Sequence, residues 1–182
     1  MRALLTFVVL FASLDALADA KSGEQKAQLC LLCHKPGNAM AAAPLLEAQP
    51  SKYLVVATTE YKTGKRPEPS MKTNVERLSA RDIKDIAEYF ASRPAVAGVY
   101  ATDPAKVSAG EVRVAAMKCA ACHGAAFAGA EMVPRLAGQT TGYLISQMEA
   151  FATARRAHPS IETPFNKIAD VEAIANYFTS LK

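Results

Sequence analysis

Four cysteines and two histidines of this sequence fall in two identical five-residue frames. Residues 30–34 and residues 119–123 both read C-x-x-C-H. The chemically active positions are Cys30, Cys33 and His34 in the first frame and Cys119, Cys122 and His123 in the second. Thiols three positions apart share one helical face, so both can add to the vinyl groups of one haem while the adjacent imidazole binds the iron. The spacing predicts two covalently attached c-type haems, each with histidine as its first axial ligand.

Two other interpretations of the cysteines exist. Each C-x-x-C pair could be a redox motif, or both pairs could form one zinc site. Neither explains a histidine at the same place in both frames. Because two haems use all four cysteines, no disulfide is expected and no thiolate remains as an axial ligand.

The chain around the frames is an internal duplication. The frames begin 89 residues apart, and flanking residues match at an offset of 90. The pairs include Pro44 with Pro134, Gln49 with Gln139, Tyr53 with Tyr143, and Arg66 with Arg156. Each copy has fewer than ~80 residues, a size at which an apolar core alone is marginal, so a buried haem would complete it.

Hydrophobic periodicity predicts an all-α fold with three helices in each half. They are expected over residues 22–30, 51–63 and 79–92, and over 109–119, 141–154 and 170–181. Ser79 and Asp82 resemble a capping box, and Asp170 is expected to be an N-cap. The predicted organisation is a signal peptide over 1–20, a domain over 21–97, a linker over 98–108 and a second domain over 109–182.

The first 20 residues are typical of a secretory signal peptide. An apolar run of ~12 residues is followed by two small-x-small patterns, which predict cleavage after Ala18 or after Ala20. An uncleaved anchor is the alternative, but a bilayer span needs roughly 20 apolar residues and Asp15 interrupts this run. We therefore expect an exported protein in an oxidising, periplasm-like compartment.

The composition excludes several other classes of protein. With 51% hydrophobic and 21% charged residues the chain is globular rather than disordered. Its net charge of +4 comes without a long basic run, so a nucleic-acid partner is not expected.

Together, the signal peptide, the tandem C-x-x-C-H frames, a Pro-x-Leu about ten residues after each frame and a Tyr-containing last helix resemble the cytochrome c4 family. The resemblance covers nearly the whole mature chain. It implies two class I cytochrome c domains that each expose one haem edge. It also implies that the carbonyls of Pro44 and Pro134 accept a hydrogen bond from Nδ1 of His34 and His123, which fixes the imidazole tautomer.

The sixth iron ligand differs between the halves. Met71 lies 37 residues after His34, where the family places its distal methionine. A thioether ligand raises the potential and closes the iron to other ligands. Met40 precedes Pro44 and belongs to the proximal side.

In the second half, the position paired with Met71 is Ile161, which cannot bind iron. His158 is the only histidine outside the frames, and as a ligand it would give bis-His coordination with a lower potential. An open or water-bound haem is the main alternative. Ligation by Met132, Met148 or a lysine is the other.

Two basic pairs, Lys65-Arg66 and Arg155-Arg156, recur at one place in both halves and could bind haem propionates. Other lysines could form a docking surface for an acidic partner. These are Lys52, Lys62, Lys72, Lys84 and Lys118.

Two function classes follow from the sequence. The first is a periplasmic dihaem carrier of single electrons, not an enzyme, whose partners would be a terminal oxidase, a membrane quinol-oxidising complex or a periplasmic dehydrogenase. Such a partner could also bring it to a membrane surface. The second is a haem enzyme or small-ligand binder whose open second haem reacts with peroxide, NO or a sulfur oxyanion. A degenerate second domain with a purely structural haem is a third interpretation.

Overall fold

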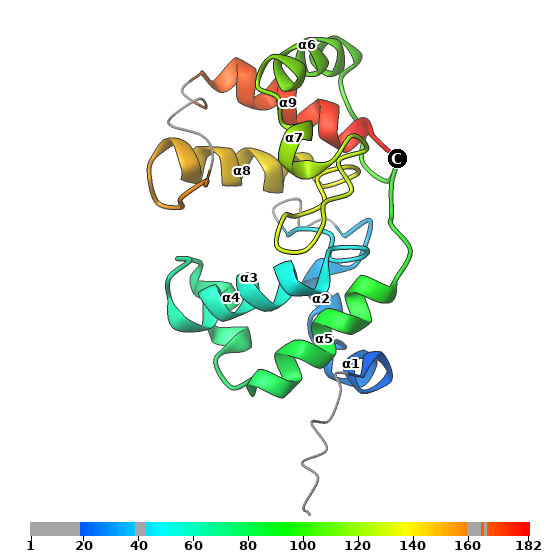
Figure 1. The fold of residues 1–182 in the computed structure, drawn as a ribbon, viewed down its shortest axis with the longest axis vertical. Helices are drawn as coiled ribbons and strands as arrows, with labels where there is room; N and C mark the ends of the chain where they lie inside the picture. Colours follow the sequence, from blue (N-terminus) through cyan, green and yellow to red (C-terminus); the bar gives the residue numbers. More distant parts are fainter. Residues whose placement is uncertain (1–18, 39–42, 160–164, 166) are drawn as a thin grey trace, which may run out of the picture.

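The computed structural model describes residues 19–38, 43–159, 165 and 167–182, which form two groups of helices joined by one extended connection (Figure 1). The first group contains α1 (Ala20–Lys26), α2 (Leu31–His34), α3 (Ser51–Thr63), α4 (Pro69–Val75) and α5 (Ala80–Ser92). The second contains α6 (Pro104–Ala116), α7 (Ala120–His123), α8 (Thr141–Ala152) and α9 (Ile168–Ser180). Within the described residues there is no strand, only an isolated bridge between Ala130 and Val133, so the all-α prediction is confirmed.

Several helix limits follow the local sequence closely. Helix α3 has the predicted bounds. The capping box before α5 is present, because the Ser79 hydroxyl accepts from the Asp82 backbone N–H and the Asp82 carboxylate accepts from the Ser79 N–H. Both contacts satisfy backbone donors that a helix start leaves unpaired.

Other limits differ from the prediction. Helix α6 begins at Pro104, inside the predicted linker, because the Asp103 carboxylate caps it by accepting from Ala105 N at 2.9 Å. Asp170 is not an N-cap. Lys167 holds that position, and Asp170 lies in the first turn of α9, where its carboxylate pairs with Arg113.

Helix α4 was not predicted from the sequence. It spans seven residues and begins with Pro69 at its first position. Proline is tolerated there because the backbone N–H that it lacks would form no hydrogen bond within the helix. It packs against α3. Met71 therefore lies in a short helix rather than in a loop.

The first and last helices of each half cross at a glycine. A Cβ on Gly23 would lie 1.9 Å from the Asp85 carbonyl oxygen, and one on Gly110 would lie 2.1 Å from that of Ala173. Only glycine permits so close an approach of two backbones. The same crossing in both halves supports the internal duplication.

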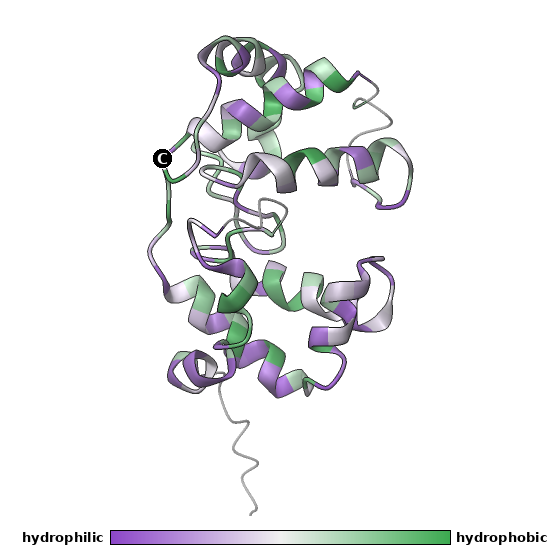
Figure 2. Cartoon of the chain, turned by 180° about the vertical axis from the view of Figure 1, so that it is seen from behind, coloured by the Kyte–Doolittle hydropathy of each residue, from purple (hydrophilic) through white to green (hydrophobic). Residues whose placement is uncertain are grey.

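Each half has its own apolar core beside these crossings. In the first half it includes Ala27, Leu54, Ala87 and Phe90. In the second half the core is larger and contains Met148, which is 6% exposed, as expected of a core residue rather than a ligand. In Figure 2, α1 is mostly hydrophilic, and the centre of α8 is hydrophobic.

Two buried glutamines join the halves by the same contact made twice. Gln139 accepts from Leu45 N at 2.8 Å and donates to Leu45 O at 3.0 Å. Gln49 accepts from Arg135 N at 3.0 Å and donates to Arg135 O at 2.9 Å. Because both pairs of residues are related by the offset of 90, the interface has a pseudo-two-fold arrangement.

Candidate haem sites

Each C-x-x-C-H frame forms a single helical turn. The His34 N–H donates to Cys30 O at 2.9 Å, and the His123 N–H donates to Cys119 O at 3.0 Å. The turn places the two cysteines of each frame on one side. All four thiols are free, as covalent capture of a haem requires.

The chemistry of the thiols opposes the redox and zinc interpretations. A redox C-x-x-C motif lowers the pKa of its reactive thiol, whereas burial raises the pKa of Cys30 and Cys119. Among the residues that the structure describes, no group of three or more His, Cys, Asp or Glu side chains could hold a metal ion, which excludes a zinc site made from both cysteine pairs.

The two frame histidines are buried and oriented by proline carbonyls. Nδ1 of His34 lies 2.7 Å from Pro44 O, and Nδ1 of His123 lies 2.9 Å from Pro134 O. A carbonyl can only accept, so Nδ1 carries the proton and the lone pair of Nε2 is available to iron. Burial also lowers the pKa of both imidazoles, which keeps them neutral. The predicted hydrogen bonds are present, and both sites fit a haem.

A buried guanidinium between the halves also fits a haem. Arg66 is 5% exposed and donates to Tyr143 Oη at 2.6 Å and Gln147 Oε1 at 2.5 Å. Its guanidinium carbon lies 4.5 Å from the centre of the Tyr61 ring. None of the ion pairs among the described residues includes Arg66. Because an uncompensated buried charge is costly, a haem propionate is a fitting counter-ion.

The repeat partner of this arginine reaches the same place. Arg156 donates to Gln147 Oε1 at 2.8 Å, so one amide oxygen accepts from both arginines. Their neighbours in the sequence do not join them: Lys65 is exposed and pairs with Glu60, and Arg155 is exposed and donates to Thr153. The sequence did not indicate the role of Gln147, because the amide has no counterpart in the first half.

His158 lies close to the frame histidine of the second half. The ring centroids of His158 and His123 lie 6.3 Å apart, with the planes inclined by 34°. Two imidazoles bound to one metal ion from opposite sides at about 2.0 Å would place their centroids about 6 Å apart. The His158 ring also packs edge-on against Phe151 at 5.1 Å. The structure thus brings together the two histidines that the sequence had linked only by elimination.

The other candidate ligands lie in different surroundings. Met71 is partly buried on α4, in the half that contains His34. Met132 is 65% exposed, and Met148 lies in the second core. Ile161 and Met40 lie outside the described residues.

Comparison with known proteins agrees with these sites. The family model described as cytochrome c matches residues 107–182. Cytochrome c4 from Pseudomonas aeruginosa is 32% identical to this chain over the full length of both proteins. The chain belongs to the cytochrome c4 family. As a dihaem electron-transfer cytochrome it carries two covalent haems, and the cysteine pairs at 30/33 and 119/122 fit them.

The fold of this cytochrome matches solved structures of the family. Reduced recombinant cytochrome c4 from Pseudomonas stutzeri superposes with a TM-score of 0.80 at 26% identity, covering 91% of this chain and all of that chain. None of the helices in the described part of this cytochrome is long and apolar enough to cross a membrane.

Two further relatives have thiosulfate dehydrogenase in their names. The thiosulfate dehydrogenase electron acceptor of Thiomonas intermedia is 28% identical over 82% of this chain and 77% of its own length. A thiosulfate dehydrogenase structure from Marichromatium purpuratum has a TM-score of 0.74 at 25% identity, covering 90% of this chain and 40% of that one.

Proposed function

We propose that this protein is an exported periplasmic electron carrier with two unequal haems, in domains over residues 21–97 and 109–182. The first haem is ligated by His34 and Met71, and the second by His123 and His158. The observation that carries this proposal is the 6.3 Å separation of the His123 and His158 rings, which leaves room for one metal ion between them.

The haems supply reversible one-electron chemistry at iron, and the residues of this chain set the conditions for it. The frame cysteines hold each haem in place. The carbonyls of Pro44 and Pro134 keep the proximal imidazoles in one tautomer, which strengthens their donation to iron. With Met71 and His158 as the second ligands, neither iron would be open to a substrate, so the haem-enzyme alternative is not favoured.

The unequal ligands give the two haems different potentials. A methionine thioether stabilises ferrous iron relative to a second imidazole, so the first haem holds an electron more tightly than the second. Electrons that enter at the second haem would therefore move to the first. Arg66 and Arg156 join the two sites through Gln147 and support this exchange by fixing the interface between them.

A periplasmic dehydrogenase is the proposed electron donor. Support comes from the two relatives named for thiosulfate oxidation, one as an electron acceptor and one as a dehydrogenase. A terminal oxidase would be the acceptor. In a stopped-flow experiment, purified thiosulfate dehydrogenase with thiosulfate should reduce this protein faster than a quinol-oxidising complex with quinol does. The reverse order would assign the donor to the membrane complex.

Carbon monoxide tests the ligation and the function together. The dithionite-reduced holoprotein should bind no carbon monoxide in an optical difference spectrum, because both irons are six-coordinate. The variant H158A should bind one equivalent per chain, and the matched variant M132A should bind none. Rapid binding of one equivalent by the wild type would overturn His158 as a ligand and favour the enzyme or ligand-binding alternative.

A further inference from the structure

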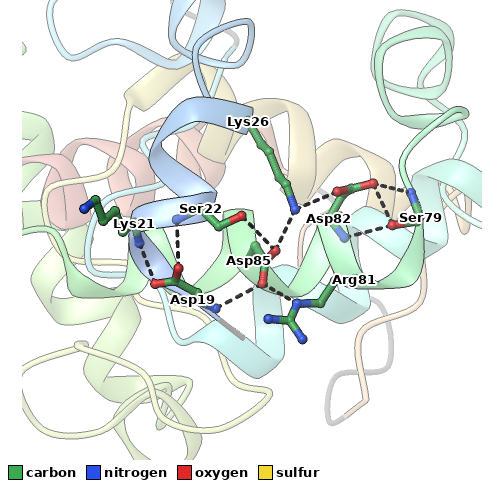
Figure 3. Close-up of polar contacts among 8 residues, drawn as sticks. All are labelled: Asp19, Lys21, Ser22, Lys26, Ser79, Arg81, Asp82 and Asp85. Atoms are coloured by element: carbon green, nitrogen blue, oxygen red, sulfur yellow. Dashed lines mark hydrogen bonds and ion pairs between the residues drawn. The ribbon is translucent and has the colours of Figure 1, made fainter. Parts of the chain in front are cut away.

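A buried carboxylate connects α1 to α5 in the first half (Figure 3). The Asp85 side chain is 2% exposed. It accepts from Lys26 Nζ at 2.6 Å, Arg81 Nε at 2.8 Å, Asp19 N at 3.0 Å and Ser22 Oγ at 3.3 Å. Four donors on one buried carboxylate make it the main polar link between the two helices.

The ion pairs of this cluster involve two carboxylates. Lys26 lies 2.7 Å from Asp82 and 2.6 Å from Asp85, and Arg81 lies 2.8 Å from Asp85. Lys26, with the further donors, holds the pKa of Asp85 well below its usual range, so this carboxyl is ionised.

The backbone nitrogen of Asp19 is the donor to Asp85 whose charge depends on where the mature chain begins. It already lies 3.0 Å from Asp85 Oδ1. Within an unbroken chain it is an uncharged amide, but at the start of a chain it is an ammonium group with three donors. The Asp19 carboxylate also caps α1, accepting from Lys21 N and Ser22 N at 3.0 and 3.3 Å.

The second half provides an internal comparison. There the capping residue of α6 is Asp103, and its backbone N–H donates to Asn176 Oδ1 on α9 at 2.9 Å. This nitrogen lies within the continuous chain, and its acceptor is a neutral amide. Ala173 takes the place of Asp85 in the second half, because its carbonyl oxygen faces Gly110 at the helix crossing as that of Asp85 faces Gly23. The carboxylate acceptor thus occurs only in the half that follows the signal peptide.

We propose that Asp19 is the first residue of the mature protein and that its α-ammonium group forms an ion pair with Asp85. The processing step is hydrolysis of the Ala18–Asp19 peptide bond by the signal peptidase of the exporting cell. Water supplies the hydroxyl of the new Ala18 carboxyl group and a proton to the Asp19 nitrogen. The inference rests on the proposed export and decides between the two cleavage positions that the sequence left open.

Cleavage after Ala20 would instead remove groups that stabilise the start of α1. It would remove the Asp19 cap of α1 and the donor 3.0 Å from Asp85. The structure therefore favours the earlier of the two small-x-small patterns.

The intact mass of the exported holoprotein tests the proposal directly. Expression with haem maturation machinery should give the mass of residues 19–182 plus two haems. A mass that starts at Lys21, or at any other processed position, would overturn the inference and leave the export proposal standing. A mass that includes residues 1–18 would overturn both.

The reactivity of the terminal amine tests the ion pair itself. An α-amino group ordinarily has a pKa of about 7.7–8.0, and an ion pair raises it. At pH 8, acetylation of the Asp19 amine, followed by peptide mass spectrometry, should be about tenfold slower in the wild type than in D85N. The matched control E172Q removes the carboxylate that pairs with Lys106 in the second half, and it should react like the wild type.

A free peptide provides a reference that does not depend on the folding of D85N. A synthetic peptide of residues 19–29 contains the same amine and lacks Asp85. It should react about tenfold faster than the folded wild type. Equal rates for the peptide and the protein would overturn the ion pair.

Discussion

The two halves of this cytochrome agree in the surroundings of the frame histidines and differ in the segments that contain the proposed distal ligands. In both, a one-turn helix holds the cysteines, and a proline carbonyl fixes the histidine through Nδ1. The crossing of first and last helices at a glycine is also shared. The proposed distal ligands, Met71 and His158, lie in unrelated local structures. The parts fixed by close backbone contact are alike in both halves, and the segments that contain these two residues differ.

The segments that contain Met71 and His158 differ in local structure. Met71 lies on α4, a seven-residue helix beside α3. His158 follows the turn after α8, where Ala154 has a left-handed φ of 54°. Neither segment belongs to a helix crossing, so the chain could change in either of them without disturbing the core.

The largest expected effect comes from making the two distal ligands alike. The variant M71H should lower the potential of the first haem by on the order of 200 mV, a fraction of the roughly 0.8 V range that axial ligands span. Optical redox titration should then show one merged transition in place of two. The surface variant M132L should keep both transitions, and two unchanged transitions in M71H would exclude Met71 as a ligand.

A second comparison concerns the paired arginines. Arg66 is buried, whereas Arg156 is only partly buried. R66Q should therefore lower the free energy of unfolding by about 3 kcal/mol, because a haem propionate beside Arg66 would lose its cation. R156Q should cost about 1 kcal/mol. Urea unfolding of the ferric holoprotein measures both values, and equal losses would refute this difference in role.

The paired glutamines should be nearly equivalent. Q49A and Q139A each leave one buried backbone N–H and one C=O unpaired, so each should lower the free energy of unfolding by about 2 kcal/mol. Q139A should be slightly worse, because Gln139 Oε1 also accepts from Thr140 N at 2.9 Å. The exposed Gln28, as Q28A, is the control in the same urea experiment. A loss confined to one of the two glutamines would show that the interface is not symmetric in energy.

The smallest of these effects is a difference between the two halves in their stability to acid. The folded-state pKa of Asp85 is depressed, so its contribution is complete above the unfolded value of about 3.9 and is lost as the pH falls below it. The groups that face this carboxylate are Lys26, whose pKa is raised by Asp82 and Asp85, and Arg81, and the pKa of Asp82 is lowered to about 2. Between pH 5 and 2.5, the haem spectrum of the first half should change before that of the second. D85N should remove this difference, and simultaneous loss in both halves of the wild type would contradict it.

Much of this fold and its sites could be predicted from the sequence because the deciding signals are local. The C-x-x-C-H frames, the limits of α3 and the capping box at Ser79 each depend on neighbouring residues. Helix α4 escaped prediction because seven residues are too few to show a period. The start of α6 was assigned to the linker, although Asp103-Pro104 is a good capping pair.

Contacts between distant segments could not be predicted in the same way. Gln49 and Gln139 are matching positions in the repeat, but no local pattern indicates that each would bind the other half. The approach of His158 to His123 depends on the path of the chain after α8, which no local pattern specifies. The role of Asp85 depends on α1, more than 50 residues earlier in the sequence.

The exchange of glutamine contacts also bears on how such a molecule could arise. A two-fold interface of this kind is the one that two identical chains form when they pair as a homodimer. A single-haem ancestor could therefore have assembled in this way before its gene was duplicated and fused. The connection between α5 and α6 then serves as a tether that raises the effective concentration of one half for the other, while the surfaces themselves specify how the halves meet.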